Sequence, residues 1–293
     1  MEKVQIAKVA VDLPLPHLDR AFDYLADGPE AADMSVGVRV KVRFAGQLRF
    51  GFVLDLVREL PRNGLSPISK VVSPESVLAP SVASLARSVA DYYAGTLADV
   101  LRLAVPPRHA TTEKSNPIEY PKPILGTPPE VLPAYPLGQP YLEALAAGEH
   151  PRSAWQIVPS SAALGDWMRG VLEAAEVALA SGRGALLLVP DKKTLDALAA
   201  LAAARFGKGS FVCLSAEAGP AARYRAFLAA RRGAVSLVLG TKAAVFAPVE
   251  NLGLVSIFDD GNDSYAGLRA PYPHTREVAV MRAYQETASL LIA

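Results

Sequence analysis

The stretch that most constrains the fold is residues 235–265, VSLVLGTKAAVFAPVENLGLVSIFDDGNDSY. Two apolar runs, residues 235–239 and 252–258, bracket a short loop, and each has the length of a strand buried in a parallel sheet. The second run ends in two carboxylates, Asp259 and Asp260. A buried strand with acids at its carboxyl end is the usual layout of an α/β nucleotide-hydrolase site, where the first acid holds Mg²⁺. The pattern leaves open the alternative of solvated aspartates in a loop after a core strand.

The sequence around this stretch alternates between strand and helix patterns. We expect further strands at residues 154–158, 184–189, 210–214 and 288–292, and helices at residues 164–180, 191–206, 220–232 and 275–286. This alternation is typical of a doubly wound parallel sheet, and it predicts one such domain over residues 151–293.

The phosphate-binding loop that this fold needs after its first strand is missing. Such a loop reads G-x-x-x-x-G-K-[ST], whereas residues 158–167 read VPSSAALGDW and contain no lysine. Without the loop amides and the lysine, the β- and γ-phosphates of a nucleotide lose their main partners, and Asp166 adds repulsion. The residues Gly240-Thr241-Lys242 stand in the wrong order to replace the motif. We therefore expect no ATP binding and no catalytic residues, with Asp259 and Asp260 as a vestigial motif.

The first 105 residues predict a small β-barrel with one helix. Strand patterns run at residues 4–11, 21–25, 38–44, 49–57 and 68–72, and Pro80 suits the first turn of the helix. In residues 38–44 (VRVKVRF) the apolar positions alternate with Arg39, Lys41 and Arg43, so that one strand face carries three cations in a row. This face either contacts DNA phosphates or is an ordinary solvated face.

Asp23 is the strongest single candidate in this module. A carboxylate repels phosphate but accepts a hydrogen bond from a hydroxyl group, and Phe22 and Tyr24 beside it offer rings for stacking a base. Together the three residues would suit the 3′-hydroxyl end of a DNA strand. The alternative is a turn aspartate between two core aromatics.

Residues 106–150 predict an extended connector, because ten of the 24 prolines in the chain fall between residues 105 and 140. Within it, His109 is expected to be solvated, and residues 141–147 to form a short helix. The single cysteine, Cys213, excludes a disulfide framework and a cysteine-based zinc site in these residues. The N-terminus does not have the pattern of a signal peptide, and no apolar run is long enough to cross a bilayer, so we expect a cytoplasmic protein without a membrane partner.

Three stretches together resemble the PriA family of replication-restart proteins. They are residues 13–24 with 37–44, residues 90–101 (ADYYAGTLADVL), and residues 240–260 with the acidic pair. The resemblance covers nearly all of the chain outside the proline-rich segment. It implies a 3′-end DNA-binding domain at residues 1–105, a reduced or absent winged-helix region at residues 106–150, and a degenerate RecA-like helicase lobe at residues 151–293.

The resemblance also implies roles for individual residues. The family's 3′-end site maps to Phe22, Asp23, Tyr24, Gly46 and Lys70, with Asp23 on the terminal hydroxyl. The family's Phe-Gly loop reads Phe44-Ala45-Gly46 here, and its Asp-Glu-Glu-His motif is altered to residues 259–262, DDGN. A second helicase lobe and zinc-binding cysteines would lie beyond Ala293, and the implied partners are primosome and single-strand-binding proteins.

Three functions are compatible with these observations. The first is a DNA-binding protein without helicase activity, which recognises forks or D-loops with a 3′-hydroxyl end and recruits primosome partners. The second is an active ATP-dependent 3′→5′ helicase in which Asp259 still holds Mg²⁺. The third is an α/β enzyme for a small metabolite, against which the absence of a convergent Ser, Cys or His set argues.

Overall fold

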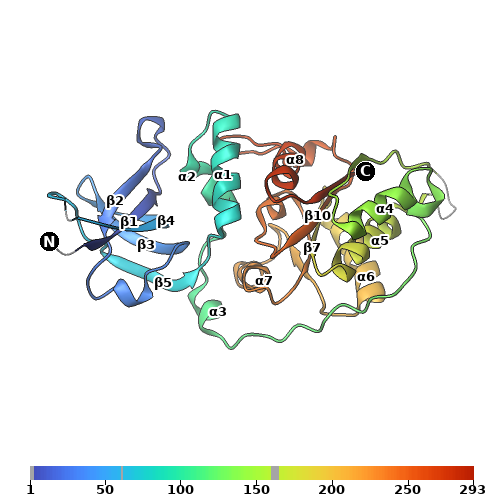
Figure 1. The fold of residues 1–293 in the computed structure, drawn as a ribbon, viewed down its shortest axis with the longest axis horizontal. Helices are drawn as coiled ribbons and strands as arrows, with labels where there is room; N and C mark the ends of the chain where they lie inside the picture. Colours follow the sequence, from blue (N-terminus) through green and yellow to red (C-terminus); the bar gives the residue numbers. More distant parts are fainter. Residues whose placement is uncertain (1–2, 61, 160–164) are drawn as a thin grey trace. The chain divides into compact units, whose positions relative to one another are not determined.

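The computed structural model describes residues 3–60, 62–159 and 165–293, and it divides into two compact units, Met1–Val105 and Pro106–Ala293 (Figure 1). The division falls where the N-terminal module was expected to end. The proline-rich segment is part of the second unit, in which it packs against the helices of the parallel sheet.

The first unit is built on a five-stranded antiparallel sheet with the order β2-β1-β4-β3-β5. Its strands are β1 (Val4–Val11), β2 (Ala21–Leu25), β3 (Val38–Phe44), β4 (Gln47–Glu59) and β5 (Lys70–Ser76). The alternation predicted for β3 is confirmed, because Val38, Val40 and Val42 are each 0% exposed. These valines pack with apolar side chains of β1, β2, β4 and β5 in one core.

A closed barrel is not confirmed, since β2 and β5 lie at opposite edges of the strand order. The end of β2 nevertheless meets the chain that leads into β5. The Leu25 amide donates to the Ser66 carbonyl at 3.0 Å, and the Ile68 amide donates to the Leu25 carbonyl at 3.1 Å. These bonds tie the two edges together at one end of the sheet.

Two helices complete the first unit, where one was predicted. Helix α1 (Pro80–Tyr92) begins at the proline as expected. Helix α2 (Leu97–Ala104) was missed, although it begins with a recognisable cap: Thr96 accepts a hydrogen bond from the Asp99 amide at 3.2 Å. Short 3₁₀ turns at Pro16–Leu18 and Ala31–Asp33 join the strands.

The second unit contains a six-stranded sheet with the order β6-β11-β10-β7-β9-β8, in which each neighbouring pair of these strands is parallel. The strands are β6 (Arg152–Ala154), β7 (Gly184–Leu188), β8 (Val212–Leu214), β9 (Leu237–Gly240), β10 (Leu252–Ile257) and β11 (Ser289–Ile292). Between them lie helices α5 (Trp167–Ala180), α6 (Lys192–Phe206), α7 (Pro220–Arg231) and α8 (Thr275–Gln285). The predicted alternation of parallel strands and helices is confirmed.

The first strand of this sheet differs from the prediction of residues 154–158. Strand β6 ends at Ala154, because it pairs with β11 only over Leu290–Ile292. The Trp155 side chain, 8% exposed, turns into the core and contacts Tyr135 edge-on at 5.3 Å between ring centroids. The strand does not continue past Ala154, because the large Trp155 ring is buried in the core instead.

The proline-rich segment contains regular structure that its composition argued against. It forms helix α3 (Ala110–Lys114), a 3₁₀ turn (Leu132–Ala134) and helix α4 (Gly138–Ala147), which confirms and extends the helix expected at residues 141–147. His109 is half-buried and is not simply solvated, since its ring accepts the Thr112 amide at 3.3 Å at the start of α3. Residues 115–137, here called the strap, connect α3 to α4 as the long green trace in Figure 1.

Two buried carboxylates on α5 hold the strap. Glu173, 2% exposed, accepts hydrogen bonds of 2.7–3.1 Å from three consecutive strap amides at residues 130–132. Glu176, 6% exposed, accepts the amides of Gly126 and Thr127 at 2.6 and 2.7 Å, and its other oxygen pairs with Arg205 at 2.5 Å. The strap has seven prolines among its 23 residues and therefore few amides to donate, and these acids bind five of those amides.

We predict that Glu173→Ala lowers the free energy of unfolding of the second unit by about 2–3 kcal/mol, because three buried amides lose a charged acceptor. Both tryptophans, Trp155 and Trp167, belong to this unit, so urea unfolding followed by tryptophan fluorescence reports on it. Glu143→Ala is the control, since Glu143 lies exposed on α4 and contacts Gln139 at 2.8 Å. Equal unfolding midpoints for the two variants would contradict the role of Glu173.

Candidate nucleic-acid interface

The structure separates Asp23 from the two aromatic residues that flank it in sequence. Successive side chains of a strand point to opposite faces, so Phe22 and Tyr24 lie on the core side of β2. Tyr24 is 4% exposed, and burial raises the pKa of its phenol. The expectation that Tyr24 offers a ring for base stacking is therefore wrong for this structure. Phe22 is half-buried and keeps part of its ring accessible.

The core-side aromatics meet the hairpin that joins β3 and β4. The Phe22 and Phe44 rings contact edge-on with centroids 4.8 Å apart, and the Tyr24 hydroxyl donates to the Arg43 carbonyl at 3.1 Å. Phe22 and Tyr24, predicted for the 3′-end site, thus contact the hairpin that holds Gly46 of the same site and Arg43, which was predicted as a phosphate contact. The Arg20 guanidinium lies 4.8 Å from the Phe22 ring centroid and adds a cation beside it.

The Asp23 carboxylate lies on the outward face of β2, with 29% of its side chain exposed. It pairs with Arg62 at 2.8 Å, and Arg62 also contacts Glu59 at 2.9 Å. Opposite Asp23 on the neighbouring strand is Lys8. The sequence pattern did not indicate either cation, because both come next to Asp23 only when the sheet forms.

The cationic face predicted on β3 gains a fourth member. Lys70 on β5 lies directly opposite Lys41, and Arg39 and Arg43 flank Lys41 along β3. Sequence reasoning missed the aromatics of this face, Phe50 and Phe52 on β4, although their spacing of two residues marks a strand face. Gly46 is exposed with φ +80°, in the tight turn between these strands.

The acidic pair of the second unit is engaged by neighbouring side chains. Asp259 follows β10 with φ +54° and accepts a hydrogen bond from the Asn262 side-chain amide at 2.7 Å. Asp260 pairs with Arg276 at 3.1 Å, and Arg276 also contacts Glu277. The Lys242 ammonium donates to the Ala266 carbonyl at 3.2 Å. Although β11 separates β10 from β6 in the sheet, the start of α5 lies beside the end of β10, because Trp167 contacts Phe258.

In a nucleotide-binding sheet the phosphate loop would be followed directly by helix α5. Here the residue before that helix is Asp166, which bears a carboxylate. Asp166 accepts the Arg169 amide at 3.2 Å and so caps the helix. The next residue, Trp167, stacks on Phe258 with ring centroids 3.4 Å apart and planes 2° from parallel. Residues 160–164 of the predicted loop position lie outside the described residues.

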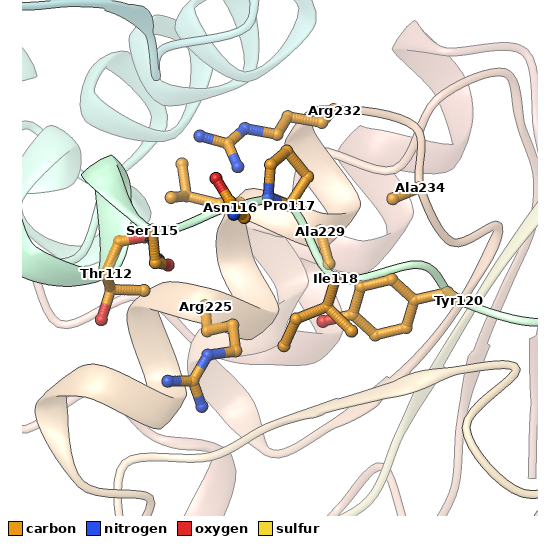
Figure 2. A pocket seen from close by; sticks show the side chains of 11 residues that line it. Thr112, Ser115, Asn116, Pro117, Ile118, Tyr120, Arg225, Ala229, Arg232 and Ala234 are labelled. Atoms are coloured by element: carbon orange, nitrogen blue, oxygen red, sulfur yellow. Dashed lines mark hydrogen bonds between the residues drawn. The ribbon is translucent and has the colours of Figure 1, made fainter.

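A separate cavity lies where the strap crosses α7 in the second unit. It is lined by Ser115, Asn116 and Tyr120 of the strap, by Arg225 in the middle of α7 and by Arg232 at its C-terminal end. In the view of Figure 2, the two guanidinium groups lie above and below Asn116 and Pro117. The mixture of arginine, amide and aromatic groups suits an anion with an apolar part.

Other classes of site find little support in the described ranges. Among these residues, no group of three or more His, Cys, Asp or Glu side chains is placed to hold a metal ion. None of the described helices has both the length and the apolar composition that crossing a bilayer requires. Cys213 packs against the core, and burial raises the pKa of its thiol to about 11, so it is protonated near neutral pH and a poor nucleophile.

The backbone of the turn that follows Phe44 is strained at Ala45, and this strain can be tested. Ala45 has φ +46°, a conformation that an asparagine tolerates better, and Asn-Gly is the preferred pair for such a two-residue hairpin. We predict that Ala45→Asn stabilises the first unit by about 1 kcal/mol, measured as a higher midpoint of urea unfolding by circular dichroism. Ala32→Asn, at an exposed position without positive φ, is the control. A gain as large in the control would argue against hairpin strain.

Comparison with known proteins finds a matching family model and several relatives. Residues 8–106 match a family model described as the 3′DNA-binding domain (3′BD) of PriA. The chain is 45% identical over 282 residues to the probable replication restart protein PriA of Mycobacterium tuberculosis (strain CDC 1551 / Oshkosh), covering 96% of this chain and 42% of that protein. It is 44% identical over 286 residues to the Mycobacterium leprae (strain TN) protein of the same description, covering 96% and 43%.

A more distant relative is the replication restart protein PriA of Treponema pallidum (strain Nichols), 26% identical over 293 residues, with 94% of this chain and 41% of that protein covered. The chain thus spans less than half the length of these relatives. Since the similarity includes both units, it reaches well beyond the matched domain. The chain belongs to the PriA family of replication restart proteins, and residues 8–106 are its 3′DNA-binding domain.

Proposed function

We propose that this chain binds DNA during replication restart, recognises forks or D-loops that expose a 3′-hydroxyl end, and recruits primosome and single-strand-binding proteins without unwinding DNA itself. The observation that carries the proposal is the partly exposed Asp23 carboxylate within the matched 3′DNA-binding domain. The relatives are named replication restart proteins, which supports replication restart as the process.

Asp23 suits a strand end better than a strand interior. An interior nucleotide carries a phosphate on its 3′ side, which a carboxylate repels, whereas a terminal 3′-hydroxyl donates a hydrogen bond to it. Arg62 beside it is 53% exposed and is a partner for the last phosphate of the strand. In this proposal Asp23 reads the hydroxyl, and Arg62 orients the carboxylate.

The remaining predicted residues take supporting roles. The Phe22 ring and the turn at Gly46 would border the terminal base, with Tyr24 holding that turn through the Arg43 carbonyl. The cations predicted on β3, Arg39, Lys41 and Arg43, would contact phosphates further from the end. Lys70, which the resemblance assigned to the 3′-end site, would join them because it lies opposite Lys41.

We expect the chain to bind a forked DNA with a 3′-hydroxyl about tenfold more tightly than the same fork with a 3′-phosphate, as measured by fluorescence anisotropy. Asp23→Ala should remove this preference by weakening binding to the hydroxyl fork alone. The control is Asp55→Ala, which removes an exposed carboxylate from β4. Equal affinities of the unaltered chain for the two forks would refute 3′-hydroxyl recognition.

The absence of helicase activity has its own support. The sequence lacks a phosphate loop, Asp166 occupies the start of α5, and Arg276 neutralises Asp260. The competing function is an active ATP-dependent 3′→5′ helicase in which Asp259 at the end of β10 holds Mg²⁺. Its one structural motivation is the position of that acid at the carboxyl edge of a parallel sheet.

We predict that calorimetric titration with Mg²⁺-ATP shows no binding tighter than about 1 mM, since the β- and γ-phosphates lack their usual partners. Asp259→Ala should leave both DNA binding and the background rate of ATP hydrolysis unchanged. Submillimolar binding, or hydrolysis that falls in this variant, would favour the helicase instead.

A further inference from the structure

The outward face of β3, β4 and β5 carries an arrangement that capture of a strand end does not explain. Its central residues are Arg39 and Lys41 on β3, Phe50 and Phe52 on β4, and Lys70 on β5; they are called here the basic aromatic face. The opposite side of β3 is the hydrophobic core. These five side chains therefore project away from the core of the unit.

The strand register interleaves cations and rings. Lys41 lies between Phe50 on one neighbouring strand and Lys70 on the other. The Lys41 ammonium is 5.0 Å from the Phe50 ring centroid, and the Arg39 guanidinium carbon is 5.1 Å from that of Phe52. Each ring thus has a cation held beside it.

Exposure of this face to water is also unfavourable in free energy. Phe50 is 46% exposed and Leu48, two residues earlier on β4, is 54% exposed. Among the described residues, neither Lys41 nor Lys70 forms an ion pair, and like charges directly opposite on antiparallel strands repel each other. An anionic ligand that covers apolar surface would relieve both costs.

Single-stranded DNA has the required chemistry. Its phosphates pair with the lysines, and its unpaired bases present flat apolar faces to the phenylalanine rings. In duplex DNA the bases stack on one another and offer only their edges. An acidic peptide would satisfy the cations but has no general counterpart to the base faces.

We infer that the basic aromatic face binds an internal segment of single-stranded DNA, with a base stacked on Phe50 and its phosphates on Lys41 and Lys70. The inference rests on the proposed DNA-binding function of this unit but not on recognition of a 3′-hydroxyl. It assigns to the domain a surface on the opposite side of the sheet from Phe22 and Tyr24.

The test compares two oligomers of equal length, both blocked with a 3′-phosphate: an oligothymidylate and an abasic oligomer with the same backbone. Phe50→Ala in the full chain should weaken binding of the oligothymidylate about tenfold, the loss expected for one stacked base, and leave the abasic oligomer unaffected. Lys70→Ala should weaken both and reduce the slope of log affinity against log salt by about 0.7.

Two further variants separate stacking from folding and from general apolar contact. Phe50→Leu keeps an apolar strand residue, and it should lose most of the preference for the oligothymidylate while its thermal unfolding stays near that of the unaltered chain. Leu48→Ala removes a comparably exposed apolar side chain without a ring, and it should change neither affinity.

The inference is overturned if the unaltered chain binds both oligomers equally, or if Phe50→Ala leaves the oligothymidylate affinity unchanged. The blocked 3′ ends remove the contribution expected of Asp23. Failure of this test therefore leaves the 3′-hydroxyl comparison unaffected, and failure of that comparison leaves stacking on Phe50 testable.

Discussion

The alternation of side chains along a β-strand is the constraint on which the first unit depends. It sends Val38, Val40 and Val42 into the core and the cations between them outward. The same constraint sends Phe22 and Tyr24 inward and leaves Asp23 on the other face. The inward side of the sheet is therefore a packed core. The outward side carries two polar surfaces, the cations of β3 and the Asp23 carboxylate of β2, because each strand contributes side chains to both sides of the sheet.

The second unit depends on a different interaction, the binding of strap amides by buried carboxylates. Glu173 and Glu176 on α5 accept hydrogen bonds from five backbone amides of a segment that is too rich in proline to form a sheet or a long helix. The strap is thereby packed onto the parallel sheet as part of one unit. The acidic residues at the carboxyl edge of this sheet contact Asn262 and Arg276.

Prediction from sequence succeeded where the periodicity was strong. The five strands of the first unit and most elements of the parallel sheet were expected within a few residues of their observed bounds. It failed where a local signal was weak or competed with composition: α2 has only eight residues, and α3, which has five, forms within the proline-rich segment. Strand β6 ends earlier than predicted because the Trp155 side chain is buried in the core. No local sequence pattern specifies that burial.

By itself, the sequence determined the family, the two types of sheet, the cationic strand and the absence of a G-x-x-x-x-G-K-[ST] motif, since each is a matter of residue types at fixed local spacing. Only the tertiary structure decided which of these residues are neighbours. It paired Asp23 with Arg62, placed Lys70 opposite Lys41, and set Phe50 and Phe52 beside the cations of β3. Strand register and the packing of distant segments settle such contacts, and neither can be read from the spacing of residues along one stretch of chain.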